Sequence, residues 1–362
     1  MNIKRIILSG GGTGGHIYPA ITIASELLLR DKNSEILFVG ANNKMEMKIV
    51  PKYGFYILGL WISGFNRTNF LKNILVPLKL LISLFQSLII IKRFKPNVVI
   101  GTGGYASGPI VYVANLLNIP TLIQEQNSLP GITNKLLSKR VNKICVAYEN
   151  LEKYFPKNKI VLTGNPVRSN ISEHSDLFDK GIEFFDLDPN KKTMLVIGGS
   201  LGSREINKAI YSIVDYLKYI NLQVIWQCGK LYYDQYKQKV ISYDIKLFDF
   251  VDDIALAYSV SDFIISRSGA SSVSELSIVG KPVIFIPSPN VAEDHQLKNA
   301  LAVVQNEGAL LVEEKNIDDL KKRISELNSS SELRNKLSKN IKRTAFINAT
   351  IDIVNEIKKL TN

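Results

Sequence analysis

Short apolar runs alternate along the whole chain with longer stretches in which apolar residues recur every three or four positions. Such short runs are typical of strands buried on both faces of a parallel sheet, and the periodic stretches are typical of the connecting helices. In the first half, we predict strands at residues 5–8, 35–39, 98–100, 121–123, 143–147 and 159–162. In the second half, we predict strands at 194–197, 223–227, 246–248, 263–266, 283–286 and 309–312. The pattern predicts an α/β protein with two Rossmann-like domains.

The domain boundaries follow from where this alternation stops. Residues 1–164 form the predicted N-terminal domain, and residues 193–340 form the predicted C-terminal domain. Between them, residues 165–192 are polar, contain Pro189 and show no strong period, so we expect a linker with at most a short helix. Residues 331–359 predict a pair of helices, and we expect the final segment, 341–362, to pack back on the N-terminal domain.

One stretch, residues 74–91, is unusually hydrophobic for a connecting helix. Its polar interruptions are Lys79, Ser83, Gln86 and Ser87, and the basic residues Lys92, Arg93 and Lys95 follow it. Three interpretations remain open: a helix that covers a sheet face, a helix that lies on a membrane surface, and a membrane-spanning helix. Pro77 and Lys79 disfavour the spanning helix.

The net charge of +12 is unevenly distributed: residues 1–164 carry +13 and residues 165–362 carry −1. This asymmetry predicts an anionic partner for the first half, whether acidic lipid, a charged substrate or nucleic acid. Only three apolar residues precede the first glycines, which does not resemble a signal peptide, so we expect a cytoplasmic protein. The two cysteines, Cys145 and Cys228, are expected to be buried and reduced, with no disulfide and no metal site.

Three predicted strands run directly into glycine-rich turns, at residues 10–16, 101–105 and 198–203. Glycines allow backbone N–H groups to approach an anion closely, and a following helix start favours negative charge. The first turn formally matches the dinucleotide-binding pattern, but residues 38–43 carry no acid at the tip of the second strand to bind a ribose. A nicotinamide or flavin cofactor is therefore disfavoured. Two interpretations of the glycine-rich turns remain: a phosphate-binding loop and a simple tight turn.

A second constellation lies at residues 266–275, where small and hydroxylated residues open a helix ahead of Glu275. This carboxylate could accept hydrogen bonds from two ribose hydroxyls while the helix start faces a diphosphate. Ordinary helix capping is the structural alternative. Residues 292–300, after Pro287 and Pro289, form a predicted loop entering a helix, with polar groups suited to a sugar.

Taken together, these motifs resemble those of the MurG family, glycosyltransferase family 28. The segments that carry the resemblance, in order along the chain, are 11–16, 103–105, 124–127, 164–168, 198–200, 268–270 with Glu275, and 293–296. The resemblance implies a GT-B fold, in which two Rossmann-like domains with parallel sheets face a central cleft. It also implies inverting transfer of GlcNAc from UDP-GlcNAc to lipid I, which forms lipid II in peptidoglycan synthesis, without a metal or other cofactor.

The resemblance assigns candidate site residues by motif position. The candidates for binding the donor substrate are Thr13, Gly14, Gly15, Asn127, Arg168, Ser200, Val251, Ala270, Ser271, Ser272, Val273, Ser274, Glu275 and Gln296. The candidates for binding the acceptor diphosphate are Gly14, Gly15, Gly103, Gly104 and Tyr105. The family contact at the position of Val251 is made largely through backbone and often uses Ile. One departure is Leu201, where a Gln commonly follows the Ser.

Inverting transfer needs a base for the acceptor hydroxyl and positive groups for the departing diphosphate. His16 is the candidate base, since it ends the first glycine turn and histidine titrates near neutral pH. A histidine that orients the acceptor phosphate, or packs at the helix start, remains the alternative role. Arg168 is the candidate partner of the diphosphate. His174 is expected to face solvent, and His295 to shape the sugar loop.

The expected partners are UDP-GlcNAc, lipid I, an anionic membrane surface and other proteins of cell-wall synthesis. The expected location is the cytoplasmic face of the plasma membrane, as a peripheral protein. An alternative within the same fold is a transferase that glycosylates another lipid, such as diacylglycerol. A nucleic-acid-binding module is disfavoured because no basic helix with interleaved aromatic residues occurs.

Overall fold

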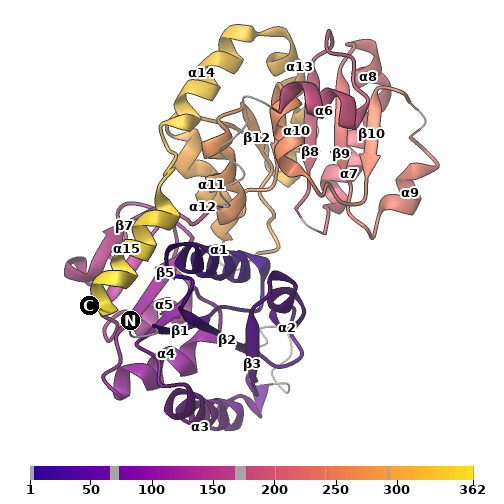
Figure 1. The fold of residues 1–362 in the computed structure, drawn as a ribbon. Helices are drawn as coiled ribbons and strands as arrows, with labels where there is room; N and C mark the ends of the chain where they lie inside the picture. Colours follow the sequence, from indigo (N-terminus) through magenta and orange to yellow (C-terminus); the bar gives the residue numbers. More distant parts are fainter. Residues whose placement is uncertain are drawn as a thin grey trace. The chain divides into compact units, whose positions relative to one another are not determined.

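The computed structural model describes residues 4–65, 73–167, 177–199, 201–240, 242–291 and 294–361. The chain divides into two compact units. Unit 1 comprises Met1–Val167 and Asn348–Asn362, and unit 2 comprises Arg168–Ile347. Each unit contains one sheet with helices around it (Figure 1). Every strand pair in both sheets is parallel, which confirms the prediction of two Rossmann-like domains.

The sheet of unit 1 has seven strands in the order β3-β2-β1-β4-β5-β6-β7. In chain order they are β1 Arg5–Ser9, β2 Glu35–Ala41, β3 Tyr56–Leu60, β4 Val98–Gly101, β5 Thr121–Glu125, β6 Lys143–Val146 and β7 Ile160–Leu162. The helices of this unit are α1 Gly14–Arg30, α2 Glu46–Ile49, η1 Val50–Tyr53, α3 Val76–Phe94, α4 Ser107–Leu116, α5 Ile132–Leu137, η3 Lys157–Lys159 and α15 Ala349–Thr361.

The hydrophobic pattern did not predict β3, so the expected set of strands in the first half is wrong at this point. β3 is an edge strand that pairs only with β2. Tyr56 is 68% exposed, and Gly59 interrupts the short apolar run. Tyr56, Ile57 and Leu58 still form a short apolar run, so the prediction overlooked this strand although its apolar signal was present.

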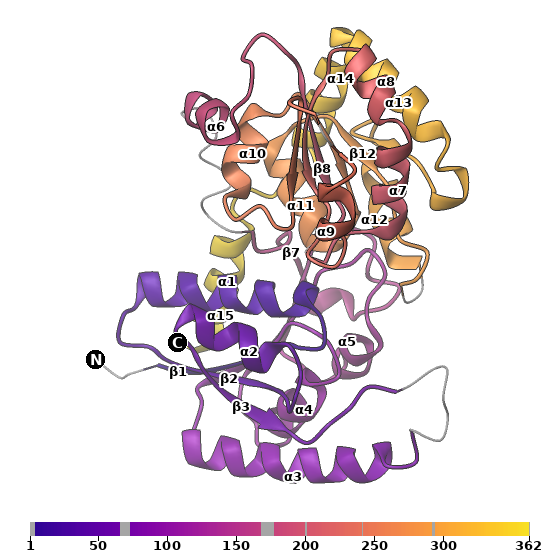
Figure 2. The ribbon, with the colours of Figure 1, turned by 90° about the vertical axis from the view of Figure 1, so that its right-hand side faces the viewer.

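Apolar side chains on both faces explain why the central strands of unit 1 read as continuous apolar runs. On β1, Ile6 and Leu8 join a core that includes α1 and α15, whereas Ile7 joins a second core under α3 and α4. Figure 2 shows α1 and α15 along one face of the sheet and α3 and α4 along the other. Successive side chains of a strand point to opposite faces, so one sheet supports two cores.

The sheet of unit 2 has six strands in the order β10-β9-β8-β11-β12-β13. In chain order they are β8 Thr193–Ile197, β9 Gln223–Gln227, β10 Ile245–Phe248, β11 Phe263–Ser266, β12 Val283–Phe285 and β13 Leu310–Leu311. The helices of this unit are α6 Phe178–Phe185, α7 Arg204–Ser212, α8 Val214–Tyr219, α9 Tyr233–Lys237, α10 Ile254–Val260, α11 Ala270–Val279, α12 His295–Val304, η6 Glu314–Asn316, α13 Asp319–Ser329 and α14 Ser331–Lys342.

Two segments near the expected domain boundaries have defined places. Helix α6, inside the expected linker, packs against α10, where the Ser259 hydroxyl donates to the Leu177 carbonyl over 3.1 Å. This part of residues 165–192 therefore belongs to unit 2. The two helices expected near the end of the chain are α14 and α15. Helix α14 lies in unit 2, whereas α15 packs against α1 in unit 1 through Ile353, Val354 and Ile357.

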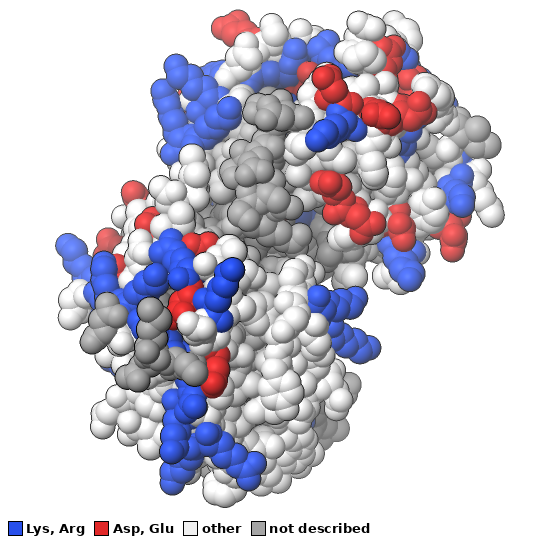
Figure 3. All heavy atoms as spheres, viewed as in Figure 1, with Lys and Arg blue, Asp and Glu red and all other residues white. Residues whose placement is uncertain are grey.

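The hydrophobic stretch 74–91 forms most of α3, and both faces of this helix carry apolar side chains: Leu84 and Leu88 pack on the core of unit 1, whereas others face solvent. The side chains of Ser83, Ser87 and Ile91 are buried, whereas Leu81 is 66% and Phe85 is 63% exposed. Figure 3 shows Lys and Arg side chains gathered over the lower end of unit 1, where Figure 1 places α3. Within the described ranges, no helix is both long and apolar enough to cross a membrane.

Both cysteines are buried and unpaired, as the sequence predicts. Cys145 lies in β6, and burial, the largest cause, raises the pKa of its thiol to about 12. Cys228 directly follows β9, and burial raises the pKa of its thiol to about 11. These environments suit space-filling thiols rather than reactive ones.

Candidate functional site

In unit 1, the first two glycine-rich turns lie side by side because β1 and β4 are neighbours in the sheet. Ser9 at the end of β1 pairs in register with Gly101 at the end of β4. The Thr102 hydroxyl donates to the His16 carbonyl over 2.7 Å and so links the second turn to the start of α1. Gly104 has a φ of +79°, and a Cβ there would lie 2.2 Å from the Gly11 carbonyl oxygen. Only glycine permits this close approach.

His16 is half-buried at the junction of these two turns. Its Nδ1 atom lies 3.2 Å from the Gly11 carbonyl oxygen and 3.2 Å from the Thr13 hydroxyl. Because a carbonyl oxygen can only accept a hydrogen bond, we assign the ring proton to Nδ1. The Nε2 atom then keeps its lone pair and can accept a proton. On this side of the ring, a Cβ on Gly103 would lie only 3.1 Å from Nε2.

Tyr105 stands over the first glycine turn. A Cβ on Gly12, which has a φ of +86°, would lie 3.3 Å from its Cε1 atom. Burial is the main cause that raises the pKa of the Tyr105 phenol, and the negative charge of Glu46 adds to this effect. The phenol therefore stays protonated at neutral pH and can donate a hydrogen bond.

The segment around Asn127 is held by buried polar contacts. The buried carboxylate of Glu125 accepts from the Asn127 backbone N–H over 3.0 Å and from Asn134 Nδ2 over 2.8 Å. Burial raises the pKa of Glu125, although the hydrogen bonds to its carboxylate act in the opposite direction. Asn165 connects this segment to the 164–168 motif, because its Oδ1 accepts from Gln124 Nε2 over 2.9 Å.

This segment also contacts the second glycine turn. Gln126 is buried, and its Nε2 donates to the Thr102 carbonyl over 2.7 Å. Its Oε1 atom has no hydrogen-bond partner in the part of the chain that the structure describes. Unit 1 therefore brings together four segments that resemble family motifs, 11–16, 103–105, 124–127 and 164–165.

In unit 2, the third glycine-rich turn is fastened to Val251 by one side chain. The buried amide of Gln227 donates through Nε2 to the Gly199 carbonyl over 3.0 Å and accepts through Oε1 from the Val251 N–H over 2.9 Å. Val251 is itself buried, so only its backbone could face a ligand.

Arg267 links the same turn to the residue 266–275 constellation. Its guanidinium donates to the Ser203 hydroxyl over 2.5 Å and to the Ile286 carbonyl over 2.9 Å, and it pairs with Glu314. These contacts tie together the loops that follow β8, β11, β12 and β13.

The constellation at residues 270–275 forms the first turns of α11. Ala270 and Val273 are buried, so they could contact a ligand only through backbone. Ser271, Ser274 and Glu275 have the spacing of one helix face and are all partly exposed. The helix begins after Gly269, which has no side chain to cap it. Ser272 is also partly exposed.

Gln296, in the first turn of α12, joins this group. The Ser268 hydroxyl donates to its carbonyl over 2.8 Å, and its Oε1 accepts from the Ser288 N–H over 2.9 Å. Asn299, buried one turn later, donates to the Ser268 carbonyl over 3.4 Å. Unit 2 thus brings together the 198–199, 251, 268–275 and 296 positions.

Some expected positions lie outside the described residues. These are Arg168, Ser200, His174 and Glu293. Thr13 and Gly15 are exposed and Gly14 is partly exposed at the start of α1, where Thr13 makes no side-chain cap.

Two buried residues that the motifs do not single out hold the glycine turns. Glu46 accepts from the Gly12 N–H over 3.1 Å, and Gln227 holds Gly199 and Val251. The only sequence signal for Glu46 is its place as the first acid after the second strand. A ribose-binding acid would be expected at the tip of the second strand, whereas Glu46 lies beyond it.

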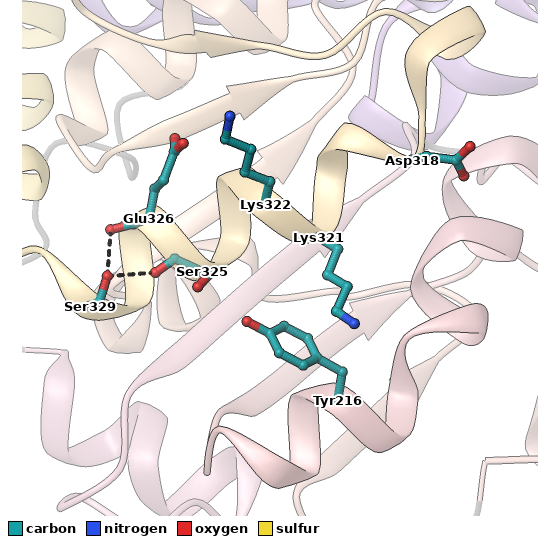
Figure 4. A pocket seen from close by; sticks show the side chains of 7 residues that line it. All are labelled: Tyr216, Asp318, Lys321, Lys322, Ser325, Glu326 and Ser329. Atoms are coloured by element: carbon teal, nitrogen blue, oxygen red, sulfur yellow. Dashed lines mark hydrogen bonds between the residues drawn. The ribbon is translucent and has the colours of Figure 1, made fainter.

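Unit 2 also has a surface hollow of about 480 Å³ between α8 and α13 (Figure 4). Its lining carries both signs of charge, and Lys321 Nζ lies 4.4 Å from the centre of the Tyr216 ring. None of the candidate site residues lines this hollow. Across the described ranges, no group of three or more His, Cys, Asp or Glu side chains gathers to hold a metal.

Comparison with solved structures identifies the fold of the whole chain. A crystal structure of MurG from Acinetobacter baumannii matches with a TM-score of 0.79 and 26% identity, covering 98% of this chain and 99% of that one. A UDP-GlcNAc 2-epimerase from Neisseria meningitidis matches with a TM-score of 0.69 at 16% identity, covering 99% of this chain and all of that one. The second likeness shows the fold alone, so the fold does not decide the reaction.

Sequence comparison identifies the family. The glycosyltransferase family 28 N-terminal domain matches residues 6–146, and the family 28 C-terminal domain matches residues 193–353. A relative from Flavobacterium psychrophilum is 57% identical, covering 99% of this chain and 98% of its own length. A relative from Cytophaga hutchinsonii is 50% identical, covering 99% and 97%. Both are named UDP-N-acetylglucosamine–N-acetylmuramyl-(pentapeptide) pyrophosphoryl-undecaprenol N-acetylglucosamine transferase. The chain therefore belongs to glycosyltransferase family 28 and, within it, to the MurG family of N-acetylglucosamine transferases.

Proposed function

We propose that this protein transfers GlcNAc from UDP-GlcNAc to lipid I, undecaprenyl-diphospho-MurNAc-pentapeptide, and so forms lipid II in peptidoglycan synthesis. The observation that carries the proposal is the clustering of the expected residues in each unit. The acceptor candidates and the donor candidates Thr13, Gly14, Gly15 and Asn127 lie in unit 1 with His16, and the described donor candidates of unit 2 lie around α11. Relatives with this named activity align over nearly the whole chain.

The donor is proposed to bind at the loops of unit 2. The partly exposed face of Ser271, Ser274 and Glu275 offers hydroxyl groups and a carboxylate to the ribose and diphosphate. The N-terminus of α11, which begins after Gly269, favours a negative phosphate. Gln296, in the first turn of α12, contacts the sugar of UDP-GlcNAc. Val251 contacts the uracil base through its backbone.

The reaction is proposed to invert the anomeric carbon. The acceptor hydroxyl oxygen bonds to that carbon while the bond from the carbon to the β-phosphate oxygen breaks, and UDP leaves with the electron pair. The hydroxyl proton passes to His16 Nε2, which is the unprotonated ring nitrogen in the assigned tautomer. Arg168 and backbone N–H groups stabilise the departing diphosphate. Gly14, Gly15, Gly103, Gly104 and Tyr105 hold the acceptor diphosphate.

The exposed face of α3 is proposed to rest on the cytoplasmic leaflet, where a lipid-linked acceptor would be reached. Leu78, Leu81 and Phe85 present apolar surface, and Lys92 and Arg93 lie in the last turn of the helix. Apolar side chains flanked by cationic ones suit an anionic membrane interface. Arg67 and Lys72, which we expected beside this patch, lie outside the described residues.

The decisive experiment measures transfer of radiolabelled GlcNAc from UDP-GlcNAc to a lipid I analogue, with UDP release followed in parallel. We expect labelled lipid and UDP in equal amounts, and a loss of at least about a hundredfold in kcat for His16→Ala. Transfer to diacylglycerol in preference to lipid I would contradict the assignment of lipid I as the acceptor. Activity of His16→Ala within a few-fold of wild type would remove His16 as the base and leave the transfer reaction standing.

A further inference from the structure

Glu46 is a fully buried acid at the start of α2, below the first glycine turn. Its Oε1 accepts from the Ala41 N–H over 3.0 Å, and its Oε2 accepts from the Gly12 N–H over 3.1 Å. No Lys or Arg in the described ranges pairs with it. Both oxygens of the Glu46 carboxylate therefore accept hydrogen bonds from backbone N–H groups.

The chain leaves room for this side chain by placing glycines beside it. A Cβ on Gly11 would lie 2.2 Å from Glu46 Oε1, and a Cβ on Gly40 would lie 2.6 Å from its Cγ. Burying a charged group is costly unless hydrogen bonds compensate for lost water. A carboxylate accommodated in this way, held by backbone donors alone, indicates a role beyond filling space.

The hydrogen bond to Gly12 lies on the same peptide group as the hydrogen bond to His16. The Gly12 N–H and the Gly11 carbonyl belong to one peptide, and in a trans peptide they point in opposite directions. Glu46 accepts from the N–H end, and His16 Nδ1 donates to the carbonyl end. A single peptide therefore separates a buried negative charge from the imidazole ring.

We propose that Glu46 is a positioning residue for His16 that acts through the Gly11–Gly12 peptide. This inference rests on the proposed function, in which His16 is the base. Because Glu46 accepts a hydrogen bond from the Gly12 N–H, it polarises the Gly11–Gly12 peptide. The Gly11 carbonyl then becomes a stronger acceptor for His16 Nδ1–H. The stronger bond fixes the tautomer in which Nε2 is unprotonated, and it stabilises the imidazolium formed when Nε2 takes the acceptor proton.

Three other described residues near His16 in unit 1 do not supply this charge. Tyr105, from the loop after β4, remains neutral because its pKa is raised. From the end of β5, Gln126 does not titrate, and its Oε1 lies 3.6 Å from where a Gly103 Cβ would be. Glu125, also at the end of β5, directs its carboxylate to Asn127 and its neighbours instead.

The test compares wild type, Glu46→Gln, His16→Ala and the double variant in the transfer assay across pH. Glutamine keeps the shape but turns one oxygen into an NH2 group that faces a backbone N–H. We expect Glu46→Gln to lower kcat by about 10- to 100-fold with the KM for UDP-GlcNAc within about twofold. In this variant the His16 imidazolium would be less stable. The acid limb of the plot of kcat against pH should therefore move to lower pH.

The double variant separates positioning from a structural role. If Glu46 acts through His16, Glu46→Gln should have no further effect in the His16→Ala background. Equal losses in both backgrounds, with an unmoved acid limb, would overturn the proposal. Glu356→Gln is the matched control, since Glu356 is a buried acid of unit 1 on α15 that pairs with Lys359. It should leave the kcat profile unchanged.

A second measurement keeps the proposal testable if Glu46→Gln does not fold. The chain has three histidines, so a nitrogen-15 spectrum of wild type compared with His16→Ala identifies the His16 ring. We expect the Nδ1–H tautomer at neutral pH. An Nε2–H tautomer would overturn the proposal without affecting the transfer reaction, whereas full activity of His16→Ala would show that the base assignment itself had failed.

Discussion

Replacing two exposed apolar residues of α3 with serine should weaken membrane binding without unfolding the protein. Leu81 is 66% and Phe85 is 63% exposed. Full burial of such a side chain contributes about 1.5–3 kcal/mol, so the exposed two thirds correspond to about 1–2 kcal/mol per residue. For Leu81→Ser/Phe85→Ser the loss is about 2–4 kcal/mol, which lowers the partition coefficient by about 30-fold to several hundredfold.

Vesicle flotation measures this partition coefficient with neutral and with anionic vesicles at two salt concentrations. Wild type should prefer anionic vesicles, and salt should weaken this preference because Lys92 and Arg93 contribute through exposed charge. The control Leu29→Ser removes another leucine of unit 1, 73% exposed on α1. An equal loss in the control, or unchanged flotation of the double variant, would refute the assignment of α3 as the membrane-binding surface.

The remaining predictions concern the glycine turns and a buried thiol. Gly104→Ala should lower kcat at least about tenfold and destabilise the protein by about 1–3 kcal/mol, because the positive φ and the Gly11 carbonyl oppose a Cβ; unchanged thermal unfolding would contradict this. Gln227→Leu leaves the Val251 N–H without its acceptor, so the Kd for UDP by calorimetry should rise at least about tenfold with little change at the His16 side; an unaltered Kd would count against it. The pKa of the Cys145 thiol is about 12 in the folded protein and about 8.5 in the unfolded chain. Its contribution to the free energy of unfolding is therefore complete below about pH 8 and is lost as the pH rises towards 12. Between about pH 9 and 11, the free energy of unfolding of wild type should fall faster than that of Cys145→Ala by about 1.4 kcal/mol per pH unit, and equal slopes in chemical denaturation would refute this.

The apolar runs were sufficient to predict the central strands of both sheets. Ile6, Ile7 and Leu8 are all buried, since the two faces of β1 support separate cores. β3 was not predicted, although Tyr56, Ile57 and Leu58 form a short apolar run ahead of Gly59. Pairing with β2, which is a long-range contact, makes Tyr56–Leu60 a strand.

The motifs predicted glycine turns at the ends of strands, and the structure places them there. The glycine turns follow strands whose carboxyl ends lie at one edge of a parallel sheet, so the approach of residues 10–16 to 101–105 follows from the strand order. The residues that hold these turns were hidden. Glu46 and Gly12 are 34 residues apart in the chain. No local sequence pattern predicts that a carboxylate will accept hydrogen bonds from backbone N–H groups alone.

By itself, the sequence determined the α/β class, the two parallel sheets, the glycine turns and the family, because these depend on local periodicity and on motifs that keep their order. Only the tertiary structure decided which side of α3 faces solvent, because apolar residues surround the helix: Leu84 and Leu88 pack on the core, while Leu81 and Phe85 are exposed. Only the tertiary structure also placed Glu46 and His16 at opposite ends of one peptide. Both outcomes arise from contacts between segments distant in the chain, whose energies no local stretch of sequence contains.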